Sequence, residues 1–281
     1  MGGMSVRPSV GEREAALDGI LAGLGSVVVA FSGGVDSSYL ALRSARVLGS
    51  RSLAVTADSE SLAEAQRQMA LQVVERFQIP HRLVRTFELE DPRYARNQPD
   101  RCYHCKTELF RRLLPLARAE GYAHVAYGLI VDDLSEPRPG HRAAAEAGVK
   151  SPLAEAGLSK ADVRELSRAA GLPTWDLPAS PCLSSRVAYG TPVTGPVLRQ
   201  VERAEKALAA LGFREFRVRH LGTSARVEIA LVELGRLEDA ALRRDVERAV
   251  AEAGYATVLV DPRGYRRGSL NEGLAALDSG V

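Results

Sequence analysis

Hydrophobic and polar positions along the chain alternate between short apolar runs and longer amphipathic stretches. Apolar-rich runs that predict buried strands lie at 26–31, 51–57, 81–86 and 124–128. Helices are expected around them, at 13–24, from the loop after residue 31 to about 48, at 61–77 and at about 100–120. Strands that alternate with helices predict an α/β fold with a doubly wound parallel sheet.

The pattern changes near Pro173. The segment 173–196 is rich in Pro, Ser, Thr and Gly and has no clear period, which predicts a long functional loop or linker. A helix, two strands, a helix and a strand are expected after it, at 196–211, 216–220, 226–230, about 237–253 and 256–260. These elements predict a small α+β domain. We therefore divide the chain into an N-terminal α/β domain, a linker that bears a cysteine and a C-terminal domain, with boundaries at 1–175, 176–195 and 196–281.

Composition narrows the classes of protein to consider. Of the 281 residues, 46% are hydrophobic and 26% are charged, which excludes wholesale disorder. No run approaches the roughly 20 apolar residues of a membrane helix. The first ten residues lack a charged-then-apolar signal pattern, so we expect a cytoplasmic protein. The net charge of +2 gives no basic field for nucleic acid, and no nucleic-acid partner is expected.

The strongest motif is the string Ser-Gly-Gly-Val-Asp-Ser at 32–37, between the first strand and its helix. Two glycines let the backbone turn sharply and approach a ligand. Amides at a helix N-terminus favour an anion such as phosphate, and Asp36 suits a magnesium ion bound to that phosphate. The alternative is an ordinary turn capped by serine. We assign the phosphate site to Ser32, Gly33, Gly34, Asp36, Ser37 and Ser38.

Other candidates lie where further strands end. Ala57 and Asp58 end the second strand, where sheets of this kind bind adenine and ribose. Asp133 and Arg138 follow the fourth strand, at the same edge of the sheet. Lys106 can neutralise charge on a phosphate. For each of them the alternative is ordinary polarity of a strand end, loop or helix. The acidic stretch 88–91 is expected to be a solvated loop.

All three cysteines of the chain lie in polar stretches rather than in apolar core runs. Their odd number, in a chain without an export signal, argues against a disulfide scaffold. Cys102 and Cys105 share one face at the start of a helix, where backbone amides favour thiolates. With Cys182 they suit an iron–sulfur cluster with one open iron, or a zinc site with an outside ligand. The alternative for the pair is two half-buried structural cysteines.

The loop resembles that of the PP-loop ATP pyrophosphatases, and the chain as a whole resembles the LarE-type sulfur transferases among them. Any one of the later motifs is weak, but their order and spacing together are specific, and they cover nearly the whole chain. Besides the loop, the resemblance rests on Asp132 with Arg138-Pro-Gly140, Ser184-Ser-Arg-Val-Ala-Tyr-Gly190, Arg217-Val-Arg219, Arg226-Val-Glu228 and Gly264-Tyr-Arg-Arg-Gly268.

This resemblance implies an enzyme with an ATP-binding N-terminal domain that uses ATP and Mg²⁺. The reaction implied has two steps: ATP adenylylates a carboxylate of pyridinium-3,5-dicarboxylic acid mononucleotide, and a sulfur nucleophile then displaces AMP to leave a thiocarboxylate. The substrate is thus a small carboxylated derivative of nicotinic acid mononucleotide. The product belongs to the biosynthesis of the nickel-pincer nucleotide cofactor of lactate racemase. A homo-oligomer, a hexamer, is also implied, while the external sulfur source stays open.

Members of the family differ in how they supply sulfur. Some give up the sulfur of their own cysteine, and others use three cysteines to hold a [4Fe-4S] cluster. With the Ser-Ser-Arg stretch in register, the sacrificial cysteine falls at Pro181 and not at Cys182. The sacrificial subtype also lacks the pair Cys102 and Cys105. We therefore expect a [4Fe-4S] cluster on these two residues and Cys182, with sacrificial use of Cys182 as the alternative.

Substrate contacts are assigned from residue type and from the resemblance. Ser185 and Arg186 follow Cys182 and suit a carboxylate or a phosphate, and with Cys182 and Lys106 they form the predicted catalytic group. Arg217 and Arg219 alternate on a strand, so they face one side and suit the substrate phosphate. The resemblance adds Glu205 and Glu228 near a metal or the substrate. Where a further acidic ligand is expected, this chain has Arg236.

Three other functions compete with this assignment. A PP-loop tRNA thiolase also combines an ATP loop with cysteines, but it needs a basic face or domain for RNA. An amide-forming enzyme of the NAD or GMP synthetase kind needs an ammonia source and gives no role to three cysteines. An ATP-sensing binding module also leaves the cysteines unexplained.

Overall fold

The computed structural model describes residues 8–135, 138–179, 181–266 and 269. Contacts within the chain divide it into two compact units. The first unit comprises Met1–Glu88 and Cys102–Ser180, and the second comprises Leu89–Arg101 and Pro181–Val281. A short segment thus leaves the first unit and joins the second before the chain returns. The three-part division made from the sequence stays a prediction.

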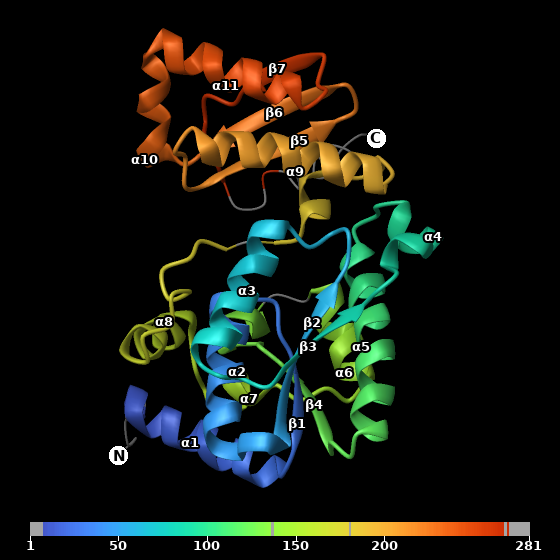
Figure 1. Cartoon of the computed structure of the whole chain (residues 1–281), viewed down its shortest axis with the longest axis vertical. Helices are drawn as coiled ribbons and strands as arrows, with labels where there is room; N and C mark the ends of the chain where they lie inside the picture. Colours follow the sequence, from blue (N-terminus) through green and yellow to red (C-terminus); the bar gives the residue numbers. More distant parts are fainter. Residues whose placement is uncertain (1–7, 136–137, 180, 267–268, 270–281) are drawn as a thin grey trace, which may run out of the picture. The chain divides into compact units, whose positions relative to one another are not determined.

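The first unit is built on a parallel sheet in the order β3-β2-β1-β4 (Figure 1). Its strands are β1 (Val27–Ala30), β2 (Ser52–Asp58), β3 (His81–Arg85) and β4 (His124–Tyr127). β1 is central and wholly buried, as its continuous apolar sequence predicts. The four predicted strands and the α/β class are confirmed. The carboxyl ends of all four strands lie at one edge, where such sheets bind ligands.

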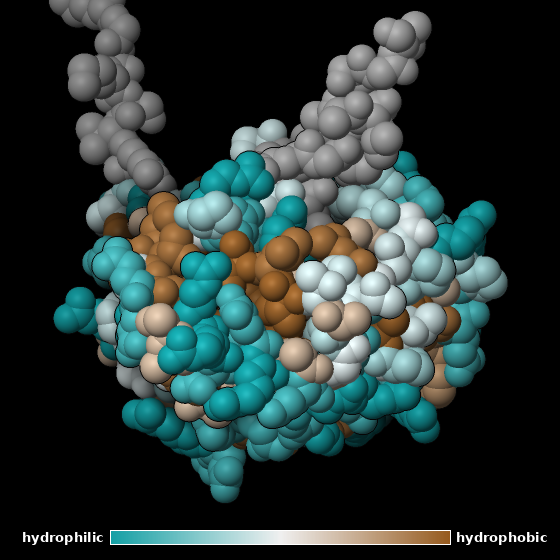
Figure 2. All heavy atoms as spheres, turned by 90° about the horizontal axis from the view of Figure 1, so that it is seen from above, coloured by the Kyte–Doolittle hydropathy of each residue, from teal (hydrophilic) through white to brown (hydrophobic). Residues whose placement is uncertain are grey.

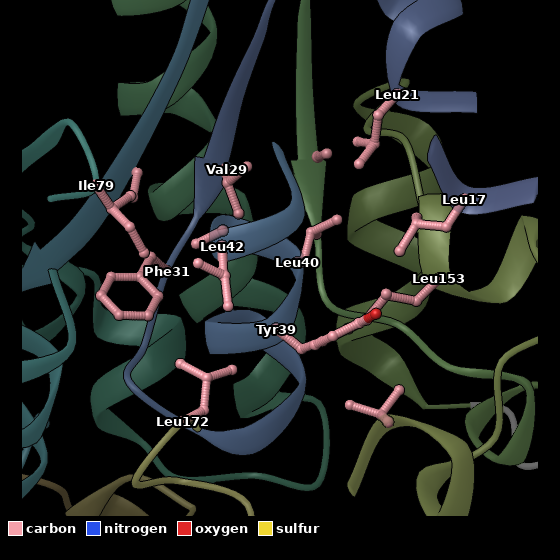
Figure 3. Packing of buried hydrophobic residues seen from close by; sticks show 14 of the residues in the cluster. Leu17, Leu21, Val29, Phe31, Tyr39, Leu40, Leu42, Ile79, Leu153 and Leu172 are labelled. Carbon is pink, nitrogen blue, oxygen red and sulfur yellow. The ribbon is translucent and has the colours of Figure 1, made fainter. Parts of the chain in front are cut away.

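Helices cover both faces of this sheet. Alternate residues of β1 enter two separate cores: Val27 and Val29 pack in one, and Val28 and Ala30 in the other. The first core adds side chains from α1 (Val10–Leu24), α2 (Val35–Leu48), α3 (Glu64–Arg76), α7 (Pro152–Glu155) and α8 (Lys160–Ala169). Figure 3 shows Tyr39, Leu40 and Leu153 among them. The second core adds side chains from α5 (Arg101–Ala119) and α6 (Pro139–Glu146).

The second unit contains a three-stranded sheet in the order β5-β6-β7. β5 (Phe216–Leu221) and β6 (Ser224–Ile229) are antiparallel, and β7 (Thr257–Val260) runs parallel to β6. Apolar residues of α9 (Gly195–Ala210) and α11 (Ala240–Glu252) form one core with β5 and β6. The predicted order of helix, two strands, helix and strand is confirmed. The unit also contains α4 (Pro92–Ala95) and α10 (Leu231–Leu234).

Several short elements were not predicted from the sequence. α6 and α8 lie in a stretch to which no period was assigned, although Ser159 caps α8 through a reciprocal bond with Asp162. The segment 173–196, predicted to be irregular, contains one turn of 3₁₀ helix, η4 (Leu183–Arg186). The acidic stretch 88–91 was predicted to be a solvated loop, and this is wrong for Glu88. Its side chain is 4% exposed and accepts a hydrogen bond of 2.7 Å from Ser61 Oγ.

The visible surface in Figure 2 is mainly hydrophilic, with apolar residues in patches between the polar ones. In the described part of the chain, no helix is long and apolar enough to cross a membrane.

Replacing Arg13 with methionine is expected to destabilise the first unit by roughly 3 kcal/mol, because a buried carboxylate loses its partner. Arg13 Nη2 donates to Asp162 Oδ1 at 2.7 Å, and both side chains are buried. The measurement is urea unfolding of wild type and variant. Arg43→Met is the matched control: Arg43 also joins two helices, but its partner carboxylates Glu14 and Asp18 are about one-third exposed. Its expected cost is about 1 kcal/mol or less.

The same ion pair makes stability depend on pH. Burial alone would raise the pKa of Asp162, but hydrogen bonds from Ser159 and the charge of Arg13 outweigh it, so the pKa is lowered. The stabilisation is therefore present above the pKa of an unfolded aspartate and is lost as the pH falls through the lowered pKa. Equal losses for the two variants, or a stability difference between wild type and Arg13→Met that does not shrink at acid pH, would contradict this account.

Candidate functional site

The loop between β1 and α2 is shaped by one glycine. Gly33 has a φ of +72°, a conformation that other residues rarely adopt. A Cβ atom at Gly33 would lie 2.9 Å from Cβ of Ala70 on α3. Gly34 is the N-cap of α2 and has extended backbone. The loop therefore closes tightly against α3, and the N-terminus of α2 follows it directly.

Hydroxyl groups hold this loop in place. Ser32 N donates to Ser37 Oγ at 3.2 Å, the two hydroxyls lie 3.1 Å apart, and Ser37 Oγ donates to Gly34 O at 3.3 Å. Gln66 on α3 adds a bond of 3.0 Å from its Nε2 to Ser32 O. Ser38 is fully buried, and within the described part of the chain its Oγ has no hydrogen-bond partner. The loop is thus held by a network of hydrogen bonds; its contact with phosphate stays a prediction.

A second glycine, which the sequence analysis did not select, lets β4 approach this loop. Gly128 directly follows β4, and a Cβ atom there would lie 3.0 Å from Ser37 N. Any larger residue would push against the first turn of α2. The signal in the sequence was available: a glycine directly after a buried strand often marks a close backbone approach.

Asp36 is the acidic group of the loop, and its partner was missed in the sequence. Its Oδ2 accepts from Lys160 Nζ at 2.6 Å, while its Oδ1 is buried and has no hydrogen-bond partner among the described residues. Burial raises the pKa of Asp36, and Lys160 opposes that shift only in part. Lys160 opens α8, and its backbone N donates to Asp132 Oδ2 at 2.8 Å. A buried carboxylate oxygen without a partner fits a cation at this point.

Asp133 and Arg138, predicted from their place after β4, lie in the same region. Arg138 Nη1 is 3.2 Å from Asp133 Oδ1. Lys160 bonds to both Asp36 and Asp132, the residue before Asp133, and the charge of Asp133 contributes to the raised pKa of Asp36. Burial lowers the pKa of His141, and the charges of Asp133, Arg138 and Lys106 also act on it. The first unit therefore brings Asp36, Asp133, Arg138 and Lys106 into one region.

Asp58 lies at the carboxyl end of β2, as predicted. Its carbonyl accepts from Thr86 N at 3.2 Å, and Arg67 Nε is 3.5 Å from its carboxylate. Ala57 precedes it in the strand. Beside them, Ser59 and Ser61 form a hydroxyl pair 2.9 Å apart that leads to Glu88. The contact of Ala57 and Asp58 with adenine and ribose stays a prediction.

Cys102, Cys105 and Lys106 lie in the first two turns of α5. Neither of these two described cysteines forms a disulfide; Cys102 is exposed and Cys105 is partly buried. Gly140 at the start of α6 packs against this turn, since a Cβ atom there would lie 3.3 Å from Lys106 Cγ and 3.6 Å from Cys102 O. The small residue permits this close approach. Lys106 Nζ lies 5.9 Å from the ring centroid of Phe110.

Cys182 is a free, partly buried thiol of the second unit and precedes η4. Arg186, which ends η4, is 3% exposed and holds the turn from within. Its Nη1 donates to Pro181 O at 2.5 Å, Cys182 O at 3.1 Å and Ser185 Oγ at 3.0 Å. Nε and Nη2 form a two-point pair with Glu205, at 2.9 and 3.0 Å. The predicted contact of Arg186 with substrate stays a prediction.

Two buried arginines lie on one face of β5. Arg219 Nε donates to Glu228 Oε2 at 2.9 Å, and its Nη1 donates to Ser185 O at 3.0 Å. Arg217 lies with its guanidinium 4.7 Å from the ring centroid of Tyr265, and burial lowers its pKa, with Arg186 as a further cause. The Gly264–Gly268 motif lies partly outside the described residues.

Arg236 lies where the sequence analysis expected an acidic metal ligand, and it does not act as that ligand. Its guanidinium donates to Gly212 O at 3.0 Å and Leu211 O at 3.1 Å, and it pairs with Glu233. In the parts of the chain that the structure describes, no group of three or more His, Cys, Asp or Glu side chains is placed to hold a metal ion. The chemistry of three cysteines outside disulfides nevertheless fits an iron–sulfur cluster.

Comparison with known proteins decides the family. The NAD synthase family matches residues 20–113, which include the glycine loop. A pyridinium-3,5-bisthiocarboxylic acid mononucleotide synthase of Lactiplantibacillus plantarum is 36% identical over 264 residues, 93% of this chain and 95% of that protein. The chain belongs to the LarE-type family of PP-loop proteins. The resemblance inferred from the motifs is confirmed.

Two further relatives are described only as uncharacterized proteins. An uncharacterized protein of Synechocystis is 41% identical over 248 residues, covering 88% of this chain and 92% of its own length. One of Methanocaldococcus jannaschii is 26% identical over 203 residues, covering 72% and 77%.

Proposed function

We propose that this protein is an ATP-dependent sulfur transferase that converts a carboxylate of pyridinium-3,5-dicarboxylic acid mononucleotide to a thiocarboxylate. This step belongs to the biosynthesis of the nickel-pincer nucleotide cofactor. Support comes from the relative named as a synthase of the bisthiocarboxylic acid, which matches nearly the whole chain. The observation that carries the ATP part is the rigid glycine loop with the buried, unpartnered Asp36 Oδ1 at the N-terminus of α2.

In the first step, a carboxylate oxygen of the substrate attacks the α-phosphorus of ATP, and pyrophosphate leaves. The loop amides and the dipole of α2 would hold the leaving pyrophosphate. Asp36 Oδ1 would bind a magnesium ion, which neutralises phosphate charge when bound. Lys106, Lys160 and Arg138 add positive charge in the same unit. In the second step, a sulfur nucleophile attacks the acyl carbon of the mixed anhydride, and AMP leaves.

Sulfur delivery is proposed to depend on Cys102, Cys105 and Cys182 as ligands of a [4Fe-4S] cluster. A cluster held by three thiolates leaves one iron open, which can carry an exchangeable sulfide. Sacrificial donation of sulfur by Cys182 itself is the alternative. We further propose that the second unit binds the substrate through Arg217 and Arg219 and mediates assembly into a homo-oligomer.

One observation favours a second candidate. The NAD synthase match covers the loop region, and the amide-forming alternative considered from the sequence is an enzyme of that kind. Ammonia in place of sulfur would attack the same adenylate and give a carboxamide. Incubation with ATP, Mg²⁺, substrate and either sulfide or ammonium, followed by mass spectrometry of the product, separates the two. A thiocarboxylate with sulfide supports the proposal, and a carboxamide alone would refute it.

Replacing Lys160 with methionine is expected to weaken ATP binding on the order of tenfold, about 1.4 kcal/mol. The ammonium group neutralises Asp36, and its loss leaves that carboxylate to repel the phosphates. Titration calorimetry with ATP and Mg²⁺ measures the effect. Lys150→Met, at an exposed lysine of the same unit, is the control and should bind ATP like wild type. Equal affinities of wild type and Lys160→Met would exclude this role.

The raised pKa of Asp36 gives a pH dependence with a defined sign. Because burial raises the pKa, the carboxylate becomes protonated at a higher pH than an ordinary aspartate does. A protonated Asp36 binds Mg²⁺ poorly, so the rate of pyrophosphate release should fall on the acid side at an unusually high pH. In Lys160→Met this acid limb should move to still higher pH, because the ion pair that opposes the shift is gone.

A further inference from the structure

A segment to which the sequence analysis gave no role, 92–101, is hydrogen-bonded along its length to the stretch that follows Cys182. Both belong to the second unit, although they lie 90 residues apart in the chain. Val193 N donates to Ala95 O at 2.8 Å, and Gly190 N donates to Asn97 O at 3.1 Å. These two backbone bonds pair residues 95–97 of the first segment with residues 190–193 of the second.

Asn97 is the centre of this pairing. It is fully buried and has a φ of +56°, which asparagine tolerates better than most residues. Its Nδ2 donates to Val187 O at 3.2 Å, Ala188 O at 2.8 Å and Thr191 O at 2.9 Å. Its Oδ1 accepts from Arg101 Nη1. The two N–H groups of one carboxamide therefore reach three carbonyls of the chain that follows η4, with one hydrogen shared between two of them.

Two further side chains reach η4 itself. Arg101 Nη1 donates to Ser184 O at 2.8 Å, and Tyr94 Oη lies 2.6 Å from Ser184 Oγ. All three residues are buried. Ser184 is the second residue after Cys182, and Arg101 directly precedes Cys102 in the chain. A buried polar network whose members are satisfied in this way rigidifies the backbone that it binds.

We propose that Asn97 and Arg101 are positioning residues for the thiol of Cys182. Arg101 holds η4 itself and Asn97 holds the chain directly after it, while Arg186 holds the same turn through Pro181 O and Cys182 O. Cys182 is thereby kept at one place rather than on a mobile linker. That the fixed thiol of Cys182 is used in sulfur transfer rests on the proposed function. The fixed position of Cys182 depends only on contacts within the second unit.

The experiment measures the reactivity of Cys182 and the retention of iron in the full-length protein. The variants are Asn97→Gly, which keeps the backbone conformation but removes the carboxamide, and Arg101→Gln. Alkylation of Cys182 by iodoacetamide, without added iron, is followed by mass spectrometry of its peptide. The iron content per chain is measured after anaerobic reconstitution. Both variants are expected to alkylate Cys182 on the order of tenfold faster and to release iron to a chelator on the order of tenfold faster.

Control variants distinguish a change in the position of Cys182 from a general loss of stability of the second unit. Arg236→Gln removes an arginine that also binds two turn carbonyls of the second unit, away from η4, and should leave Cys182 alkylation unchanged. Thermal unfolding confirms that each variant is folded. If either principal variant fails to fold, Tyr94→Phe, which removes only the hydroxyl beside Ser184, takes its place.

The outcomes distinguish this proposal from the proposed function. Alkylation rates within twofold of wild type in the folded variants would overturn the positioning role. Faster alkylation in both variants, in a protein whose wild type binds no iron, would uphold the positioning role and refute the cluster. Equal acceleration in Arg236→Gln would show a general loosening of the unit and would also overturn the proposal.

Discussion

Replacing Gly33 with alanine is expected to reduce ATP-dependent pyrophosphate release by at least a hundredfold, about 2.7 kcal/mol in the barrier. A methyl group at this position would lie 2.9 Å from Cβ of Ala70, at a φ of +72°. The glycine loop and α3 would have to separate, and the backbone amides of the loop would turn away from the phosphates of ATP. The measurement is the rate of pyrophosphate release with ATP, Mg²⁺ and the dicarboxylic acid mononucleotide.

Gly25→Ala is the matched control for this variant. Gly25 has nearly the same φ, +71°, but no described residue other than its two chain neighbours comes within 4 Å of the Cβ position. The alanine there should cost about 1–2 kcal/mol of stability through backbone strain and leave the rate unchanged. If Gly33→Ala loses no more activity than Gly25→Ala, the close approach of the loop to α3 has no part in catalysis.

Replacing Cys182 with alanine is expected to abolish thiocarboxylate formation while pyrophosphate release continues at nearly the wild-type rate. The two effects separate because the glycine loop and Asp36 belong to the first unit and Cys182 to the second. Pyrophosphate and thiocarboxylate are measured in the same reaction. Loss of both together would show that Cys182 acts in adenylylation or in the fold, contrary to the proposal.

Cys105→Ala then distinguishes the two sources of sulfur. If the three cysteines hold a cluster, this variant should lose iron and sulfur transfer just as Cys182→Ala does. If Cys182 alone donates sulfur, Cys105→Ala should remain active for one turnover, and Cys182 should become dehydroalanine in the wild type.

The sheet and the glycine loop could be predicted because their signals are local. β1 is a continuous apolar run, and the loop that follows it contains both glycines and the acidic residue. Lys160 could not be found in this way, since its partner Asp36 is 124 residues away and the helix that carries it is short. A capping pattern at Ser159 was the available signal, but it indicates a helix and not a charge pair.

The segment 92–101 was missed for a related reason. Its polar residues suggest an exposed loop, yet Asn97 and Arg101 are buried by contacts with residues 184–191. Glu88 was misjudged in the same way, because a carboxylate is normally solvated unless a partner such as Ser61 meets it in the fold. Burial of polar side chains depends on distant partners that periodicity does not reveal.

The most direct test of the central claim is anaerobic incubation of the full-length protein with ATP, Mg²⁺, sulfide and the dicarboxylic acid mononucleotide, followed by mass spectrometry of the nucleotide. The expected result is exchange of one carboxylate oxygen for sulfur, with AMP and pyrophosphate formed in equal amounts. Release of ADP and phosphate, or AMP formation with a product that contains no sulfur, would contradict the assignment of this chain as a sulfur transferase.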